Sequence, residues 1–261
     1  MDFVPAAIFL LIGFVYVIAM RRAVASTLAH GDKFPGYHWR PTEAWISLAV
    51  AGFFVLTAAL SVGREAAKID LPALESSLAL YGGIVIFVLG VLVTRDVPLV
   101  EAFGLKPASW PRLAGTTVYA LGMTIPAVFA AQWAAYAILG PETTPQPIVE
   151  FLLENPGWRE RLAVVLIAVV AAPLTEELVF RGCLYGVGRQ KFGRLPAILG
   201  TSLVFALIHA HAATIPALFV LAIGLALLYE ATGSLWAPVF AHAAFNGLNI
   251  LGSLYWPEMI R

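Results

Sequence analysis

The sequence predicts an all-α integral membrane protein with about eight transmembrane helices, built as one membrane domain over residues 1–261. Two observations lead to this fold class. Hydrophobic residues make up 60% of the chain and charged residues only 12%, whereas soluble domains have about 25% charged and about 45–50% apolar residues. The apolar residues also gather in stretches of about 20, the length that an α-helix needs to cross a bilayer.

Each predicted helix is a mainly apolar stretch bounded by polar or charged residues. The first stretch follows Asp2 and precedes Arg21 and Arg22, whereas a secretory signal places positive charges before its apolar run. We therefore expect a first helix that is retained. The predicted spans are 3–20, 44–62, 74–93, 113–139, 162–187, 197–213, 215–229 and 235–254.

Three charged residues lie inside the fifth span: Glu176, Glu177 and Arg181. Ionisable residues within a membrane are costly to bury and by default mark a functional site. Residues four apart share a face of an α-helix, so we expect Glu177 and Arg181 to form an ion pair. Glu176 is rotated about 100° around the helix axis and is left without that partner. Pro173 lacks a backbone N–H and is expected to kink the helix near Glu176.

Polar residues recur at similar depth in two later spans. The sixth contains FALIH, with Phe205 and His209, and the eighth contains HAAFN, with His242 and Asn246 four residues apart. With a rise of about 1.5 Å per residue, Glu176 and His209 lie roughly 15–20 Å from one membrane face. On the same count, His242 and Asn246 lie roughly 10–16 Å deep. We therefore expect three helices to bring these side chains together.

These residue types indicate hydrolysis by an activated water molecule. A buried glutamate near a histidine can act as a general base, and histidine and asparagine N–H groups can stabilise a developing oxyanion. The formal net charge is zero, which argues against nucleic acid as a partner. The single cysteine, Cys183, excludes an intrachain disulfide and a cysteine-rich zinc site.

The same residues form three motifs of a known family. EELVFR matches EExxxR, FALIH matches FxxxH, and HAAFN matches HxxxN. Their order on successive late spans resembles the CPBP family, the Abi, CAAX-protease and bacteriocin-processing proteins, whose eukaryotic member is the type II CAAX prenyl endopeptidase. The resemblance implies a glutamate-dependent intramembrane endopeptidase with its catalytic core over 162–254.

The resemblance also implies a role for each motif residue. Glu176 and His209 would activate the water, and His242 and Asn246 would hold the oxyanion. The ion pair of Glu177 and Arg181 and the ring of Phe205 would support the site. The implied partners are the lipid bilayer and a membrane-associated, prenylated or leader-type peptide. The composition, rich in Ala, Leu and Val with short loops, favours a bacterial inner membrane as the location.

Two alternatives remain open from the residues alone. Glu176, His209 and His242 form a His2Glu set, which is typical of catalytic zinc, although the sequence has no HExxH motif; we expect a metal-free site without a cofactor. The paired carboxylates also fit a non-enzymatic transporter or immunity protein that binds protons or a partner peptide. Against this reading, the two halves of the chain show no inverted repeat.

Overall fold

The computed structural model describes residues 18, 34–61, 69–139, 147–154 and 157–255. Within this part of the chain 86% of the residues are helical and no strand is present, so the predicted all-α fold class is confirmed. The predicted first span, 3–20, lies outside the described residues except for Ile18.

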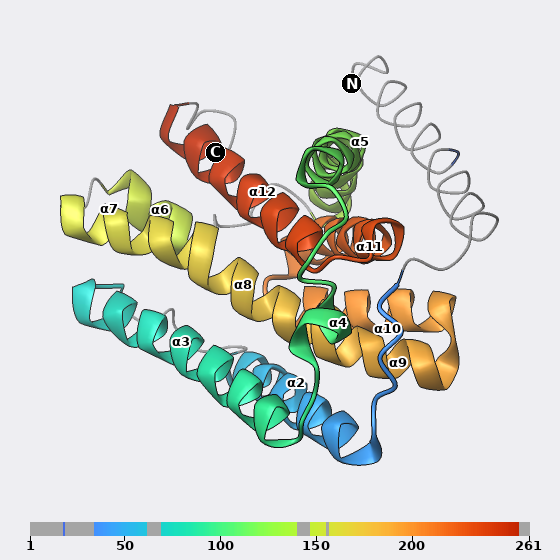
Figure 1. The fold of residues 1–261 in the computed structure, drawn as a ribbon. Helices are drawn as coiled ribbons and strands as arrows, with labels where there is room; N and C mark the ends of the chain where they lie inside the picture. The colour runs from blue at the N-terminus through green and yellow to red at the C-terminus, as the bar shows by residue number, and fades with distance from the viewer. Residues whose placement is uncertain (1–17, 19–33, 62–68, 140–146, 155–156, 256–261) are drawn as a thin grey trace.

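The helices follow one another with short connections around one long central helix, which runs from α7 to α9. Figure 1 shows α2 and α3 on one side of this helix and α10, α11 and α12 on the other, while α5 packs against α11 and α12. The elements are α2 (Pro41–Ser61), α3 (Leu71–Thr94), α4 (Leu99–Phe103), α5 (Trp110–Leu139), α6 (Pro147–Leu153), α7 (Trp158–Val165), η1 (Leu166–Ala171), α8 (Ala172–Glu177), η2 (Leu178–Tyr185), α9 (Gly186–Phe192), α10 (Arg194–Leu207), η3 (Ala212–Thr214), α11 (Ile215–Thr232) and α12 (Trp236–Tyr255).

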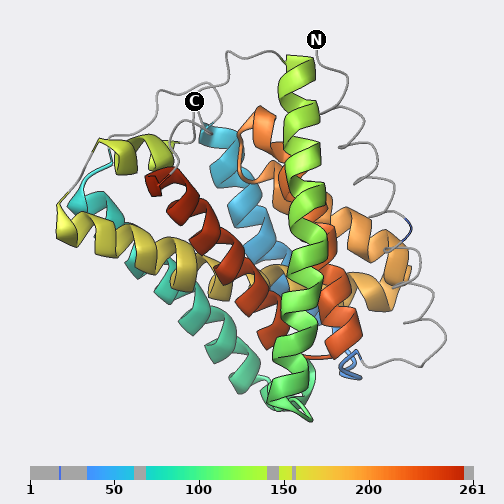
Figure 2. The ribbon, with the colours of Figure 1, turned by 90° about the horizontal axis from the view of Figure 1, so that it is seen from above.

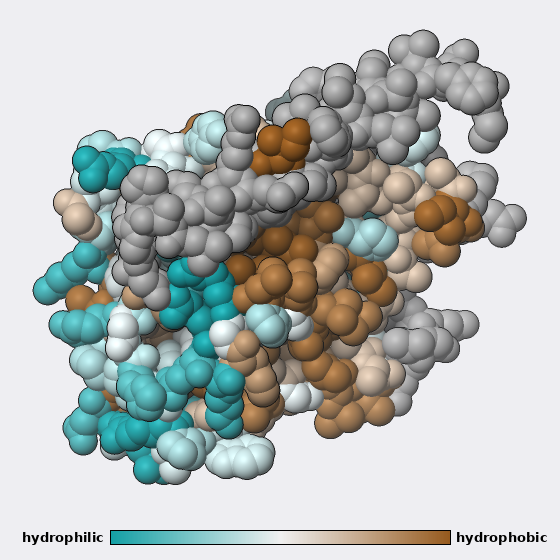
Figure 3. Space-filling model, turned by 90° about the vertical axis from the view of Figure 1, so that its right-hand side faces the viewer, coloured by the Kyte–Doolittle hydropathy of each residue, from teal (hydrophilic) through white to brown (hydrophobic). Residues whose placement is uncertain are grey.

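Five helical stretches of the described chain are long and apolar enough to cross a membrane. They are Pro41–Ser61, Leu71–Thr94, Trp110–Leu139, Trp158–Phe192 and Ala212–Thr232. The apolar helix α10 has only 14 residues, so the predicted number of eight spans is not confirmed. Figure 3 shows hydrophobic residues in a broad band beside a region of hydrophilic ones, the surface pattern of an integral membrane protein.

The central helix is not a regular α-helix. Leu166–Ala171 (η1) and Leu178–Tyr185 (η2) are π-helical, with the short α-helical segment α8 between them. Pro173 lies near the start of α8, directly after the first π segment. Because it has no N–H, it cannot complete the regular bond to the Val169 carbonyl, and the wider turn occurs where that bond is missing. Such π turns are frequent at functional sites.

A close backbone contact fixes the start of α12, the helix that carries two of the predicted site residues. Gly104 ends α4 with a φ of 61°, and Gly233 ends α11 with a φ of 66°, a left-handed conformation that glycine adopts without steric cost. A Cβ atom on Gly104 would lie 1.8 Å from the Gly233 carbonyl oxygen. The Leu235 N–H donates to the Phe103 carbonyl at 2.9 Å beside this contact.

A buried carboxylate on α11 holds α9 and α10 in place. Glu230 is 1% exposed and lies 2.6 Å from Nε of Arg189 and 2.7 Å from Nε of Arg194. The Tyr185 hydroxyl donates to the same carboxylate. These contacts fix the α9–α10 turn against α11, and so determine where α10 delivers the FxxxH residues.

Candidate active site

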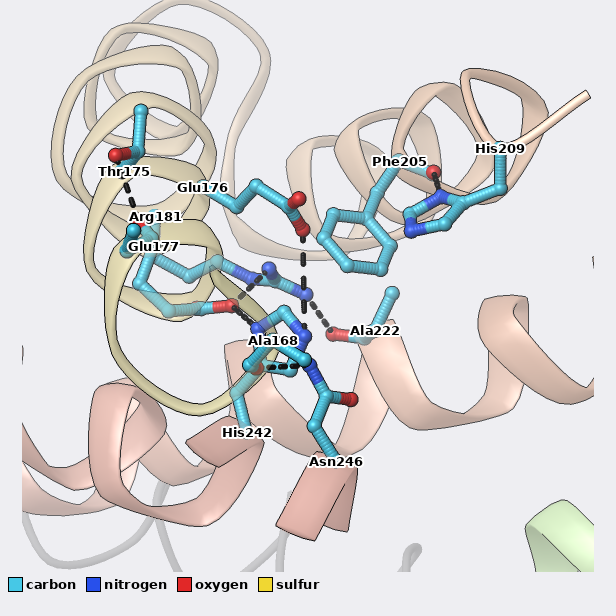
Figure 4. Close-up of polar contacts among 11 residues, drawn as sticks. Ala168, Thr175, Glu176, Glu177, Arg181, Phe205, His209, Ala222, His242 and Asn246 are labelled. Carbon is cyan, nitrogen blue, oxygen red and sulfur yellow. Dashed lines mark hydrogen bonds and ion pairs between the residues drawn. The ribbon is translucent and has the colours of Figure 1, made fainter. Parts of the chain in front are cut away.

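The candidate site lies where the central helix meets α12 and the end of α10 (Figure 4). Glu176 and Glu177 are the last residues of α8, and Arg181 follows in η2. His242 and Asn246 lie on α12. The exposed fractions are 6% for Glu176, 0% for Glu177, 1% for Arg181 and 3% for His242. Side chains buried this deeply need polar partners inside the protein.

Glu177 and Arg181 form the predicted ion pair. Nη1 of Arg181 lies 2.7 Å from Oε1 of Glu177, with both side chains buried. Arg181 also donates from Nη2 to the Ala222 carbonyl of α11 at 3.1 Å. The guanidinium therefore pairs with Glu177 and connects the central helix to α11.

His242 contacts both glutamates of the motif. Its Nδ1 lies 2.9 Å from Oε1 of Glu177, the oxygen that also accepts from Arg181. Its Nε2 lies 4.0 Å from Oε2 of Glu176. Because a carboxylate can only accept, Nδ1 of His242 carries a proton and donates a hydrogen bond to Glu177. The remaining nitrogen, Nε2, faces Glu176.

Glu176 is the carboxylate without an ion-pair partner at hydrogen-bonding distance. Its Oε2 is buried and has no hydrogen-bond partner among the described residues. Tyr81 of α3 lies beside it, since its hydroxyl interacts electrostatically with the Glu176 carboxylate. The Thr175 hydroxyl donates to the Tyr81 carbonyl at 3.4 Å, which places α3 against α8 at this level. Sequence analysis missed Tyr81; the signal for it is a hydroxyl-bearing side chain inside the apolar span 74–93.

Asn246 connects α12 to the first π segment. Its Nδ2 donates to the carbonyl oxygen of Ala168 at 2.8 Å. An asparagine amide has two N–H groups, so one of them is used for this contact and the other is left for a further acceptor. Sequence analysis identified Asn246 but not its carbonyl partner, because the partner is a backbone atom in an irregular turn.

The structure places His209 differently from the predicted helix over 197–213. α10 ends at Leu207, and His209 lies in the following turn, before Ala210 with its φ of 52°. Nδ1 of His209 lies 2.8 Å from the Phe205 carbonyl oxygen. Because a carbonyl only accepts, Nδ1 carries a proton and donates to this oxygen. His209 thus contacts the backbone carbonyl of Phe205, four residues earlier, rather than Glu176.

The Phe205 ring lies between the two histidines and the arginine (Figure 4). Its centroid is 5.0 Å from the His209 ring and 5.7 Å from the His242 ring. Cζ of Arg181 lies 4.6 Å from the same centroid, a cation–π geometry. Phe205 therefore links the turn that carries His209 to the polar cluster of the central helix.

The described side chains do not assemble into a metal site. Among the residues that the structure describes, no three His, Cys, Asp or Glu side chains are grouped so that they could hold a metal ion. Of the three ligands in the zinc alternative, Glu176 faces His242, while His209 is bonded to the Phe205 carbonyl.

Comparisons with known proteins concern the part of the chain that carries this site. Residues 158–248 match the family model described as Type II CAAX prenyl endopeptidase Rce1-like. The chain is also 26% identical over 91 residues to "Putative membrane peptidase YdiL" of Bacillus subtilis (strain 168), an alignment that spans 35% of this chain and 37% of that protein. No solved structure is significantly similar to the chain. The three motifs therefore all lie within the segment, 158–248, that matches the Rce1-like family model.

Proposed function

We propose that this protein is an intramembrane endopeptidase that hydrolyses a peptide bond with a water molecule activated by Glu176. The observation that carries the proposal is the buried Oε2 of Glu176, which has no hydrogen-bond partner among the described residues and faces Nε2 of His242 at 4.0 Å. A buried carboxylate oxygen without a hydrogen-bond partner is costly for the fold, and a catalytic role accounts for that cost. The Rce1-like family of residues 158–248 supports the same class of reaction.

In the proposed reaction Glu176 acts as a general base. It accepts a proton from water as the water oxygen bonds to the carbonyl carbon of the scissile peptide, which gives a tetrahedral intermediate with a negatively charged oxygen. The proton then passes to the amide nitrogen, the C–N bond breaks, and an amine and a carboxylic acid are released. Atoms and charge balance without a serine or cysteine nucleophile.

His209 is the proposed partner of Glu176 in activating the water. Its Nδ1–H is used by the Phe205 carbonyl at 2.8 Å, which leaves Nε2 as the basic nitrogen of the neutral ring. This protonation pattern supports an acceptor role for His209. An unprotonated Nε2 cannot donate a hydrogen bond to an oxyanion.

His242 and Asn246 are the proposed donors to the oxyanion. His242 presents Nε2 towards Glu176, and Asn246 keeps one N–H beyond the one donated to Ala168. Donors held in a water-excluded site stabilise developing charge strongly, and removing one typically costs about 2.7–4 kcal/mol of transition-state stabilisation. The burial of this site supports a contribution of that size.

The proposed substrate is a peptide or protein that is itself associated with the bilayer. The family description names CAAX prenyl endopeptidases, and this supports a prenylated peptide, with a leader-type peptide as the other member of the class. Five apolar helices long enough to span a membrane support a site inside the bilayer. The bacterial source of the matched peptidase supports the cell (inner) membrane of a bacterium as the location.

The proposal can be tested by comparing the peptide termini of membranes that contain the wild-type protein or Glu176→Gln. Glutamine has nearly the same shape as glutamate but cannot take a proton from water, so substrates of the enzyme should persist uncut in the variant. Glu75→Gln is a matched control, because Glu75 is an exposed carboxylate on α3. Identical sets of termini in all three membranes would contradict a peptidase, and full biological activity of Glu176→Gln would favour the non-enzymatic alternative.

A further inference from the structure

The cluster of Glu176, Glu177, Arg181 and His242 does not balance in charge when the His242 ring is neutral. Glu176 and Glu177 then contribute two negative charges and Arg181 one positive charge, all at exposed fractions of 6% or less. A net charge is expensive at this depth, where water cannot screen it. One additional proton makes the cluster neutral. The question is which residue holds that proton.

The geometry favours His242 over Glu176 as the holder. Each ring nitrogen of His242 faces a carboxylate oxygen, Nδ1 at 2.9 Å from Glu177 and Nε2 at 4.0 Å from Glu176. Oε2 of Glu176, the oxygen that faces His242, has no hydrogen-bond partner among the described residues, and the polar neighbour of this carboxylate on α3 is the uncharged Tyr81 hydroxyl. A proton added to His242 therefore lies between two opposite charges, one at each ring nitrogen.

No other charged group among the described residues competes for this ring. Besides α8, the elements that pack against α12 are η1, α5, α6 and α11. η1 has no titratable side chain. The charged residues of α5, α6 and α11 lie elsewhere: Glu230 is bound to Arg189 and Arg194, while Arg112 and Glu150 are exposed. On the side of α10 the ring meets Phe205 at 5.7 Å, with His209 beyond it.

We propose that Glu177 is a positioning residue that keeps His242 in the doubly protonated, imidazolium form, so that an Nε2–H donor faces Glu176 and the reacting carbonyl. Arg181 fixes Glu177 through Oε1, the oxygen that also accepts from His242. Glu177 then has a second role in addition to its ion pair with Arg181. Without its negative charge, the proton on Nδ1 would be the only one on the ring, and Nε2 could accept but not donate.

This inference relies on the proposed function for the use of the Nε2–H donor, but not for the protonation state. That state can be measured without a substrate, by 15N NMR of histidine-labelled full-length protein in detergent micelles at pH 7. The His242 signals are assigned as those lost in His242→Gln. We expect both ring nitrogens of His242 to be protonated in the wild type, whereas one of the two in His209 should be unprotonated. A neutral His242 ring in the wild-type protein would overturn the inference.

Two substitutions of Glu177 test the cause. Glu177→Gln removes the charge with little change in shape and should yield a neutral His242, whereas Glu177→Asp keeps the charge and should retain the imidazolium. Glu75→Gln controls for a lost carboxylate elsewhere on the protein. An imidazolium that persists in Glu177→Gln would refute the role of Glu177. If this variant does not fold, the wild-type spectrum and that of Glu177→Asp still decide.

With a cleavable peptide, the role of Glu177 has a kinetic signature. Glu177→Gln should lower kcat about 10²-fold to 10³-fold, the typical loss for one oxyanion donor, with little change in KM. Activity should return as the pH is lowered, because a lower pH restores the second proton of His242. A merely structural role would lower the yield of active enzyme without moving the pH profile. An unchanged profile in folded Glu177→Gln protein would therefore contradict the proposal, even if cleavage itself is confirmed.

Discussion

Glu176 and His242 face each other across 4.0 Å, between Oε2 of the first and Nε2 of the second. Two hydrogen bonds of about 2.8 Å span such a separation, so one water molecule can bond to both atoms at once. The two residues come from different helices, α8 and α12, which are held together by the contacts of Glu177 and Asn246.

Glu176→Gln should abolish cleavage while leaving the fold intact. Loss of a general base in a buried site typically costs about 10²-fold to 10⁴-fold in rate, and the amide keeps the volume of the carboxyl group. The measurement is kcat on a reporter peptide together with the thermal midpoint in detergent, with Glu75→Gln as control. Wild-type rates in folded Glu176→Gln protein would exclude Glu176 as the base.

Arg181→Ala should destabilise the protein rather than alter its chemistry alone. The change leaves Glu177 as a buried charge without its cation and removes the bond to the Ala222 carbonyl; breaking a buried pair in this way costs about 3–5 kcal/mol. We expect less folded protein in membranes and a lower thermal midpoint. If Arg181→Ala folds and cleaves normally while Glu177→Ala unfolds, the assigned roles are wrong.

The two histidines should respond differently to glutamine substitution. A glutamine side chain still has N–H donors but is not a base, so His242→Gln can keep part of the oxyanion contact, whereas His209→Gln loses the proposed acceptor. We expect about 10-fold to 10²-fold loss of kcat for His242→Gln and a larger loss for His209→Gln. The comparison uses one peptide at one pH. An intact rate in His209→Gln would remove His209 from the activation of water.

Metal chelation should leave cleavage unchanged. The proposed reaction uses only side chains of the chain, and the described residues contain no group of three His, Cys, Asp or Glu ligands suited to a metal. The measurement is the metal content of the purified protein, with activity before and after a chelator. Stoichiometric zinc, together with activity lost on chelation and restored by zinc, would establish the zinc-dependent alternative.

Gly104→Ala should destabilise the end of the molecule where α4 meets the turn before α12. The new Cβ would lie 1.8 Å from the Gly233 carbonyl oxygen, on a residue with positive φ. Backbone strain of this kind costs about 1–3 kcal/mol before the clash is counted, so the thermal midpoint should fall. Gly90→Ala is the matched control, because no atom lies within 4 Å of its added Cβ; equal midpoints for the two variants would contradict the contact.

Regular helix geometry made part of the site predictable. The pairing of Glu177 with Arg181 follows from their spacing of four, and the burial of both residues follows from the apolar stretch around them. The same reasoning separated Glu176 from the ion pair. His242 could be placed at a similar depth by counting residues, but its bond to Glu177 depends on how α12 packs against the central helix.

Irregular backbone and contacts between distant segments were not predictable. The π segments on either side of α8 depend on tertiary packing, and Pro173 alone indicates only that one hydrogen bond is missing. His209 was expected within a helix, whereas α10 ends at Leu207 and the left-handed Ala210 follows. Tyr81 approaches Glu176 from a helix with no motif of its own, so no local pattern pointed to it.

The length of the central helix bears on how water reaches Glu176 in the proposed reaction. Its 35 residues extend about 52 Å at 1.5 Å per residue, whereas the hydrocarbon layer is about 30 Å thick. Such a helix has to lie obliquely, and it runs across α5, which is seen end-on in Figure 1 and lengthwise in Figure 2. Glu176 stands near the middle of Trp158–Phe192. In the proposed reaction, each turnover therefore draws one water molecule to a carboxylate about halfway along this helix, past side chains that must also admit a peptide.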